Sequence, residues 1–202
     1  MSSHTTSRLG AVSGIAYVLG ILSLNSVESD SNVALGGEVM ALLLFLPFLA
    51  YLCGQLRHAD TSDGWLPATA LVAGIVAVAI KLAGVLPAIL VEQGELTPAV
   101  AAAFTRFGEV SFMVSMMPLG MFLAAVAALV IRSSALPTWL GWSAAIIAPL
   151  LVANAFDLAA AFGPAFILFL LWTLITAIVL LRHAAGDRTH AISRPARATA
   201  TP

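Results

Sequence analysis

Residues 79–90 read AIKLAGVLPAIL, a stretch that places Lys81 inside an apolar run. The run belongs to an apolar block at 65–91, which is long enough to cross the roughly 30 Å hydrocarbon core of a bilayer as a helix rising about 1.5 Å per residue. A charged side chain at that depth is costly, so it is expected to face other helices and to be paired. The stretch therefore predicts a membrane helix with an ionic site on its inward face.

The rest of the chain has the composition of a membrane protein. It has 202 residues, of which 60% are hydrophobic and 9% are charged, against roughly 25% charged residues in soluble domains. Apolar blocks lie at 9–24, 38–56, 65–91, 109–131, 136–162 and 164–181. These blocks predict an all-α, polytopic membrane protein with six transmembrane helices in contact with the lipid bilayer.

Basic residues are distributed unevenly among the connections. Lysine and arginine in short loops mark the cytoplasmic side of a membrane protein. One side of the predicted bundle holds Arg8, Arg57, Arg132, Arg182, Arg188, Arg194 and Arg197. The connections on the opposite side hold only Arg106. Both chain termini are therefore predicted to be cytoplasmic.

Three regions follow from this pattern. Residues 1–8 form a cytoplasmic N-terminal segment, 9–182 form the six-helix bundle, and 183–202, which lacks apolar periodicity, is predicted to be a disordered basic cytoplasmic tail. Residues 97–108, TPAVAAAFTRFG, are predicted to form a short surface helix or to extend the fourth helix, because Thr-Pro starts helices and alanine favours them. The net charge of −1 gives no reason to expect a nucleic-acid partner.

Two pairs of segments resemble each other. GEVMALLLFLP (37–47) and GEVSFMVSMMP (108–118) share Gly-Glu-Val and a later proline, and AIKLAGVLPAIL (79–90) resembles AFDLAAAFGPAFIL (155–168). The second and third helices thus resemble the fourth and fifth. This pattern predicts a parallel internal repeat with a pseudo-twofold axis along the membrane normal.

The repeat suggests how Lys81 is held. Under this alignment Lys81 and Asp157 occupy equivalent positions, so we predict that they form an ion pair, with Asn154 as a third partner one turn before the aspartate. Small residues at helical spacing surround the lysine and predict that this face points inward. This seam consists of Ala70, Gly74, Ala77, Lys81, Gly84 and Ala88.

Glu38 and Glu109 form a second matched pair. Each is predicted to open a helix at the outer face, where the helix dipole favours a carboxylate. The alternative is that both form the rim of an outward-facing cavity above Lys81 and Asp157. The candidate binding residues are then Lys81, Asp157, Asn154, Glu38 and Glu109, and the candidate acids are Asp157, Glu38 and Glu109.

No metal or cofactor is expected. Cys53 is alone, which excludes a cysteine cluster within the chain. The four histidines, which could otherwise hold haem inside the bundle, fall in predicted cytoplasmic segments. They are His4, His58, His183 and His190.

The segment LPTWLGWSAAIIAPL (136–150) carries a resemblance. Its Leu-Pro-x-Trp-Leu-Gly-Trp start resembles the entry to a helix in small bacterial multi-pass membrane proteins known only as a domain of unknown function. The resemblance implies a bacterial inner-membrane location. It transfers no catalytic residue.

Three classes of function fit these features. The first is a protein that binds or transports a small amphipathic or cationic molecule in an outward-facing pocket. The second is a membrane-embedded acid-base enzyme acting on a lipophilic substrate, in the manner of an isoprenoid cyclase, for which buried carboxyl groups would serve as acids. The third is a structural or regulatory partner of another membrane protein.

Overall fold

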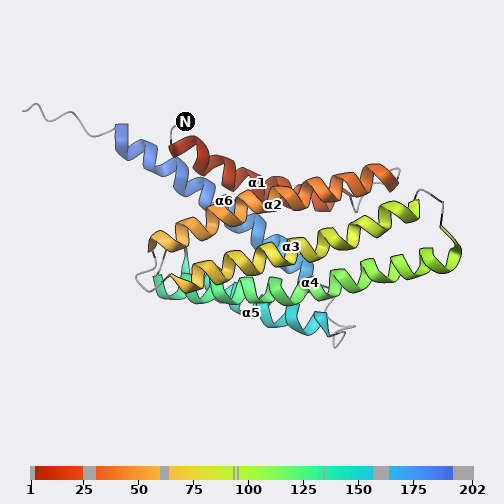
Figure 1. Cartoon of the computed structure of the whole chain (residues 1–202). Coiled ribbons are helices and arrows are strands. Elements are labelled where there is room, and N and C mark those ends of the chain that lie inside the picture. Colours follow the sequence, from red (N-terminus) through yellow and green to blue (C-terminus); the bar gives the residue numbers. More distant parts are fainter. Residues whose placement is uncertain are drawn as a thin grey trace, which may run out of the picture.

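The computed structural model describes residues 3–24, 31–59, 64–92, 94, 96–133, 135–156 and 164–192. These residues form six helices, which are labelled in Figure 1: α1 (Ser3–Leu24), α2 (Ser31–Ala59), α3 (Trp65–Glu92), α4 (Pro98–Ser133), α5 (Thr138–Ala155) and α6 (Pro164–Ile192). Away from its ends, a helix satisfies its backbone polar groups internally, as a lipid environment requires. The predicted class is confirmed: the chain is a polytopic helical membrane protein.

Five of the helices are long and apolar enough to cross a membrane. Their candidate spans are Ala34–Ala59, Trp65–Val91, Pro98–Ser133, Thr138–Ala155 and Pro164–His183. The apolar part of α1, Arg8–Ser23, is shorter than these five spans.

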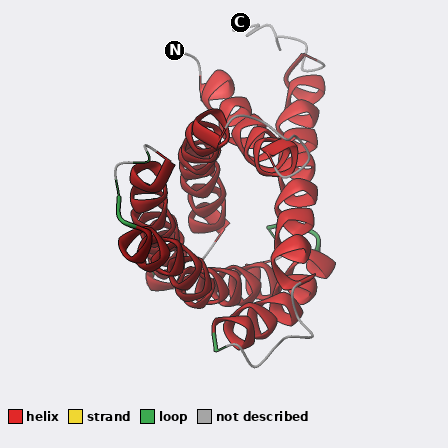
Figure 2. Ribbon diagram, turned by 90° about the vertical axis from the view of Figure 1, so that its right-hand side faces the viewer, coloured by secondary structure: helices red, strands yellow, loops and turns green. Residues whose placement is uncertain are grey.

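The helices run alternately up and down and close into a ring. Each helix packs against its neighbours in sequence, and α6 packs back against α1, which gives the ring seen in Figure 2. The ends of α1, α3 and α5 and the starts of α2, α4 and α6 therefore lie at one end of the bundle, on the right in Figure 1. We call this end the α1–α2 end. The opposite end, which holds the start of α1 and the end of α6, is called the α2–α3 end.

Several predicted boundaries are wrong. Helix α2 begins at Ser31 rather than at 38. Helix α4 begins at Pro98, so residues 98–108 extend the fourth helix, which is one of the two predicted alternatives. Helix α5 spans Thr138–Ala155, and its predicted end at 162 lies outside the described residues. Helix α6 continues to Ile192, into the tail predicted to be disordered. Hydropathy detects the part of a helix that lies in lipid, whereas backbone hydrogen bonds can continue the helix beyond it.

The inward face of α3 is predicted correctly. Ala70, Gly74 and Ala77 are buried, and a Cβ added at Gly84 would lie 2.7 Å from the Cβ of Ser111 on α4. Without a hydrophobic driving force between helices in lipid, close backbone approach at small residues supplies the packing contacts. The seam of small residues therefore joins α3 to its neighbours and turns Lys81 towards the interior.

Candidate functional site

A cavity of about 560 Å³ lies inside the ring. Its wall is built from α1, α2, α3, α4 and α6, and most of the lining side chains are apolar. The polar ones are Tyr17, Glu38, Lys81 and Ser115. A largely apolar cavity with a few polar groups on one side is the usual form of a site for a small molecule.

The charged group in the cavity is a Lys81–Glu38 ion pair. Nζ of Lys81 lies 2.9 Å from Oε1 of Glu38, and the two side chains are 24% and 25% exposed. Lys81 is three residues from the middle of the α3 span Trp65–Val91, or about 4 Å along the helix axis. Opposite charges in contact offset part of the cost of placing either one at this depth.

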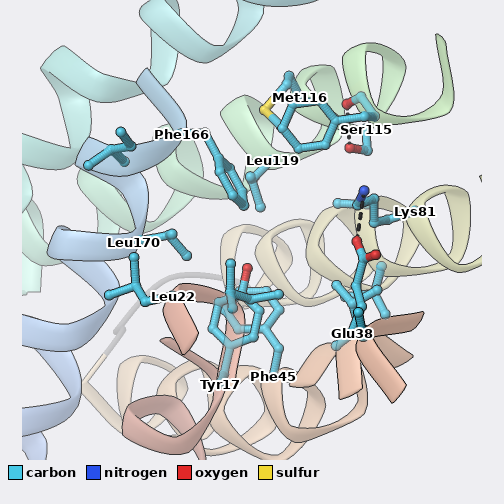
Figure 3. A pocket seen from close by; sticks show the side chains of 17 residues that line it. Tyr17, Leu22, Glu38, Phe45, Lys81, Ser115, Met116, Leu119, Phe166 and Leu170 are labelled. Carbon is cyan, nitrogen blue, oxygen red and sulfur yellow. Dashed lines mark hydrogen bonds and ion pairs between the residues drawn. The ribbon is translucent and has the colours of Figure 1, made fainter. Parts of the chain in front are cut away.

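Aromatic rings line the same cavity as this ion pair. Lys81 Nζ lies 4.7 Å from the ring centroid of Phe112, a cation–π distance. The ring of Phe112 meets that of Phe166 edge to face at 5.3 Å, and Tyr17 packs against Phe45 at 4.6 Å across the cavity wall. Figure 3 shows the Tyr17 hydroxyl pointing into the pocket. The cavity can therefore contact an apolar group on several sides.

Packed aromatic side chains close the cavity towards the α2–α3 end. Phe45 lines the cavity and lies 5.8 Å from Phe48, 6.3 Å from Phe122 and 5.9 Å from Phe169, measured between ring centroids. All four phenylalanines are buried. Tight packing here leaves the cavity in the half of the bundle near the α1–α2 end.

Of the four predicted binding residues that the structure describes, it brings two together. Glu38 and Lys81 are in contact. Glu109 does not line the cavity and instead pairs with Arg106 at 2.9 Å, where the two side chains are 50% and 80% exposed. Asn154, in the last turn of α5, also lies off the cavity wall. Asp157 lies outside the described residues, so its predicted pairing with Lys81 stays a prediction.

The prediction that both glutamates open helices is wrong. Glu38 follows the start of α2 at Ser31 by seven residues, which is about 10 Å along the axis. Glu109 lies still further into α4, which starts at Pro98. Glu38 therefore lies at the level of Lys81 rather than at a rim above it. The two glutamates have different surroundings, and the internal repeat stays a prediction.

Sequence reasoning missed the aromatic residues of the site. Tyr17, Phe45, Phe112 and Phe166 come from four different helices. Phenylalanine is common on every face of a membrane helix, so its presence alone does not distinguish a cavity wall from a lipid contact. Helices α2 and α3 are antiparallel neighbours. A start of α2 at Ser31 would place Glu38 at the same depth as Lys81 and so indicate that the two side chains can pair.

Comparison with known proteins identifies no family: no family model, curated protein or solved structure matches the chain. The resemblance of residues 136–150 to small bacterial membrane proteins accordingly stays a prediction.

Proposed function

We propose that this membrane protein binds a small amphipathic molecule in the cavity, and that binding serves either to transport that molecule or to retain it in the membrane. The observation that supports the proposal is the asymmetry of the cavity. The Lys81–Glu38 pair lies on one side, while Leu22 and Leu170 lie on the opposite side (Figure 3). A ligand with a polar end and an apolar end matches this arrangement.

The proposal extends to the orientation of the protein. Arg57 and Arg132 lie in the last turns of α2 and α4 at the α2–α3 end, and Arg182 lies on α6 near the same end. Such residues favour the cytoplasmic side. The α1–α2 end, and with it the cavity, would then face the outside of a bacterial inner membrane.

Thiol labelling tests this orientation. We expect Thr97→Cys to react with a membrane-impermeant maleimide in intact cells and His58→Cys not to react, both in a Cys53→Ala background. Both positions are exposed in the structure, so access to solvent is matched. Permeabilised cells should label both variants. Labelling of His58→Cys alone in intact cells would reverse the orientation.

Filling the cavity tests the binding function. Ala77 lines the cavity, while Ala79, two residues later on α3, is exposed on the outer surface. We expect protein extracted into lipid nanodiscs to retain a stoichiometric amphiphile in the wild type and in Ala79→Phe, and to lose it in Ala77→Phe, because the added ring occupies the ligand's volume. Mass spectrometry of extracted small molecules gives the amount bound per protein.

Folding must be separated from binding in this experiment. Ala34→Phe, on α2, fills the same cavity from another side and replaces Ala77→Phe if that variant unfolds. Size-exclusion profiles and thermal transitions should match those of Ala79→Phe. Equal retention in the wild type and in a folded cavity-filled variant would contradict the proposal.

A further inference from the structure

The cavity reaches the outer surface between α1 and α6. Leu22 and Ile167 both line the cavity, yet they are 47% and 62% exposed. A side chain that faces both the cavity and the exterior marks the rim of an opening. Leu22 lies near the end of α1, and Ile167 lies in the first turn of α6. The opening is therefore near the α1–α2 end.

The crossing of α1 and α6 explains why the opening is there. A Cβ added at Gly14 would lie 3.1 Å from the Cβ of Ala177, so the two helices touch at this level. Leu22 is eight residues further along α1, or about 12 Å. At the corresponding end of α6, Phe166 packs against Phe112 of α4 instead. The helices diverge towards the α1–α2 end, as the oblique course of α6 in Figure 1 indicates.

The surface on both sides of the opening is apolar. Leu19 on α1 and Leu171 on α6 are exposed next to the two rim residues. In a membrane-spanning bundle, exposed leucine and isoleucine contact acyl chains, because these chains are as apolar as the side chains themselves. The opening therefore faces lipid rather than water.

The polar side of the cavity favours a head group without net charge. The ion pair of Lys81 with Glu38 uses Oε1, and no other residue in the described part of the chain bonds to Oε2 of Glu38. The ammonium group has three donors, so it also has capacity beyond the pair. The ion pair has no net charge. A head group with net charge would therefore find no balancing charge in the cavity, and the cost of removing it from water would not be offset.

We propose that the ligand is a membrane amphiphile with a zwitterionic or uncharged head group, which enters sideways from the bilayer between Leu22 and Ile167. An acceptor oxygen of its head group accepts a hydrogen bond from Lys81, the cationic or donor part of the head group lies against Oε2 of Glu38, and its acyl chain extends through the opening into the lipid. This inference rests on the proposed binding function and adds the class of ligand and its route.

Photo-crosslinking in phosphatidylglycerol vesicles tests the inference. The probe is a single-chain phosphocholine with a diazirine near its head group. Two further probes carry the same chain with a phosphate or a trimethylammonium head. We expect the phosphocholine probe to label cavity residues about tenfold more than either charged probe, the size of one interaction with a charged group, because only this head group offers both a phosphate for Lys81 and a cation for Glu38. In Lys81→Met/Glu38→Leu this preference should disappear.

Variants at the opening test the route. Leu22→Trp/Ile167→Trp should reduce labelling of the cavity about tenfold by narrowing the opening, while Leu19→Trp/Leu171→Trp, on the same helices but off the cavity wall, should leave it unchanged. Water-soluble glycerophosphocholine in excess should not compete. Competition by it, or full labelling of the Leu22→Trp/Ile167→Trp variant, would overturn entry from lipid.

The head-group assignment and the binding function fail in different ways. Stronger labelling by a charged probe would overturn the neutral head group and leave binding intact. If no probe labels the cavity while Ala77→Phe still loses a retained amphiphile, the ligand class is wrong and the binding function stands. If nothing is retained or crosslinked, the proposed function itself fails.

Discussion

Lys81→Met is expected to lower the free energy of unfolding by about 3 kcal/mol, because Glu38 would be left as an uncompensated charge inside the bundle. Glu38→Leu should cost a similar amount for the converse reason. The double variant Lys81→Met/Glu38→Leu should recover much of the loss, since it leaves neither charge. Equilibrium unfolding in mixed micelles of dodecyl maltoside and dodecyl sulfate measures these differences.

A second ion pair in the same protein provides the control. Arg106 and Glu109 are also 2.9 Å apart, but their side chains are 80% and 50% exposed. Arg106→Met should leave stability unchanged, because water and salt screen a pair at such a position. If Lys81→Met proves as harmless as Arg106→Met, the loss of Lys81 does not leave Glu38 as a costly uncompensated charge, and the prediction is contradicted.

The same measurement decides between the two partners of Lys81. The sequence repeat predicts Asp157, whereas the structure pairs Lys81 with Glu38. Lys81→Met/Glu38→Leu should be more stable than Lys81→Met/Asp157→Leu if Glu38 is the main partner. The reverse order would restore the prediction from the repeat.

Gly14→Leu is expected to lower the free energy of unfolding by about 3 kcal/mol, at the top of the range for overpacking. A Cβ at this position would lie 2.5 Å from a ring carbon of Phe48 on α2 and 3.1 Å from the Cβ of Ala177 on α6. Two helices and a rigid ring would have to move together. Unfolding in mixed micelles measures the loss.

Gly54→Leu is the matched control for this substitution. Gly54 lies on α2 with nothing within 4 Å of an added Cβ. Leucine also favours helix more than glycine does, so Gly54→Leu should not destabilise the protein. Equal stability of Gly14→Leu and Gly54→Leu would contradict the close crossing of α1 and α6, and with it the physical basis of the lateral opening.

Much of the fold can be predicted from the sequence. Long apolar blocks must become helices in lipid, because no other single-segment structure satisfies the backbone there. The small residues around Lys81 predict which face of α3 is buried, and Ala70, Gly74 and Ala77 confirm it. Helix ends are harder to predict from hydropathy. The start of α2 contains polar residues and glycine, so it is helical although its hydropathy is low. Because hydropathy places the start of α2 too late, it puts Glu38 at the rim of the predicted cavity.

The sequence by itself thus determined the membrane class, the approximate positions of the helices and the need for a partner near Lys81, because each follows from the cost of polar groups in lipid. Only the tertiary structure selected Glu38 as a partner and left Glu109 outside. It also gathered Tyr17 and Phe112 around one cavity. The physical reason is that the choice depends on how α1, α2, α4 and α6 are arranged around α3, and the rotation and tilt of a membrane helix are set by its packing against neighbours rather than by its own hydropathy.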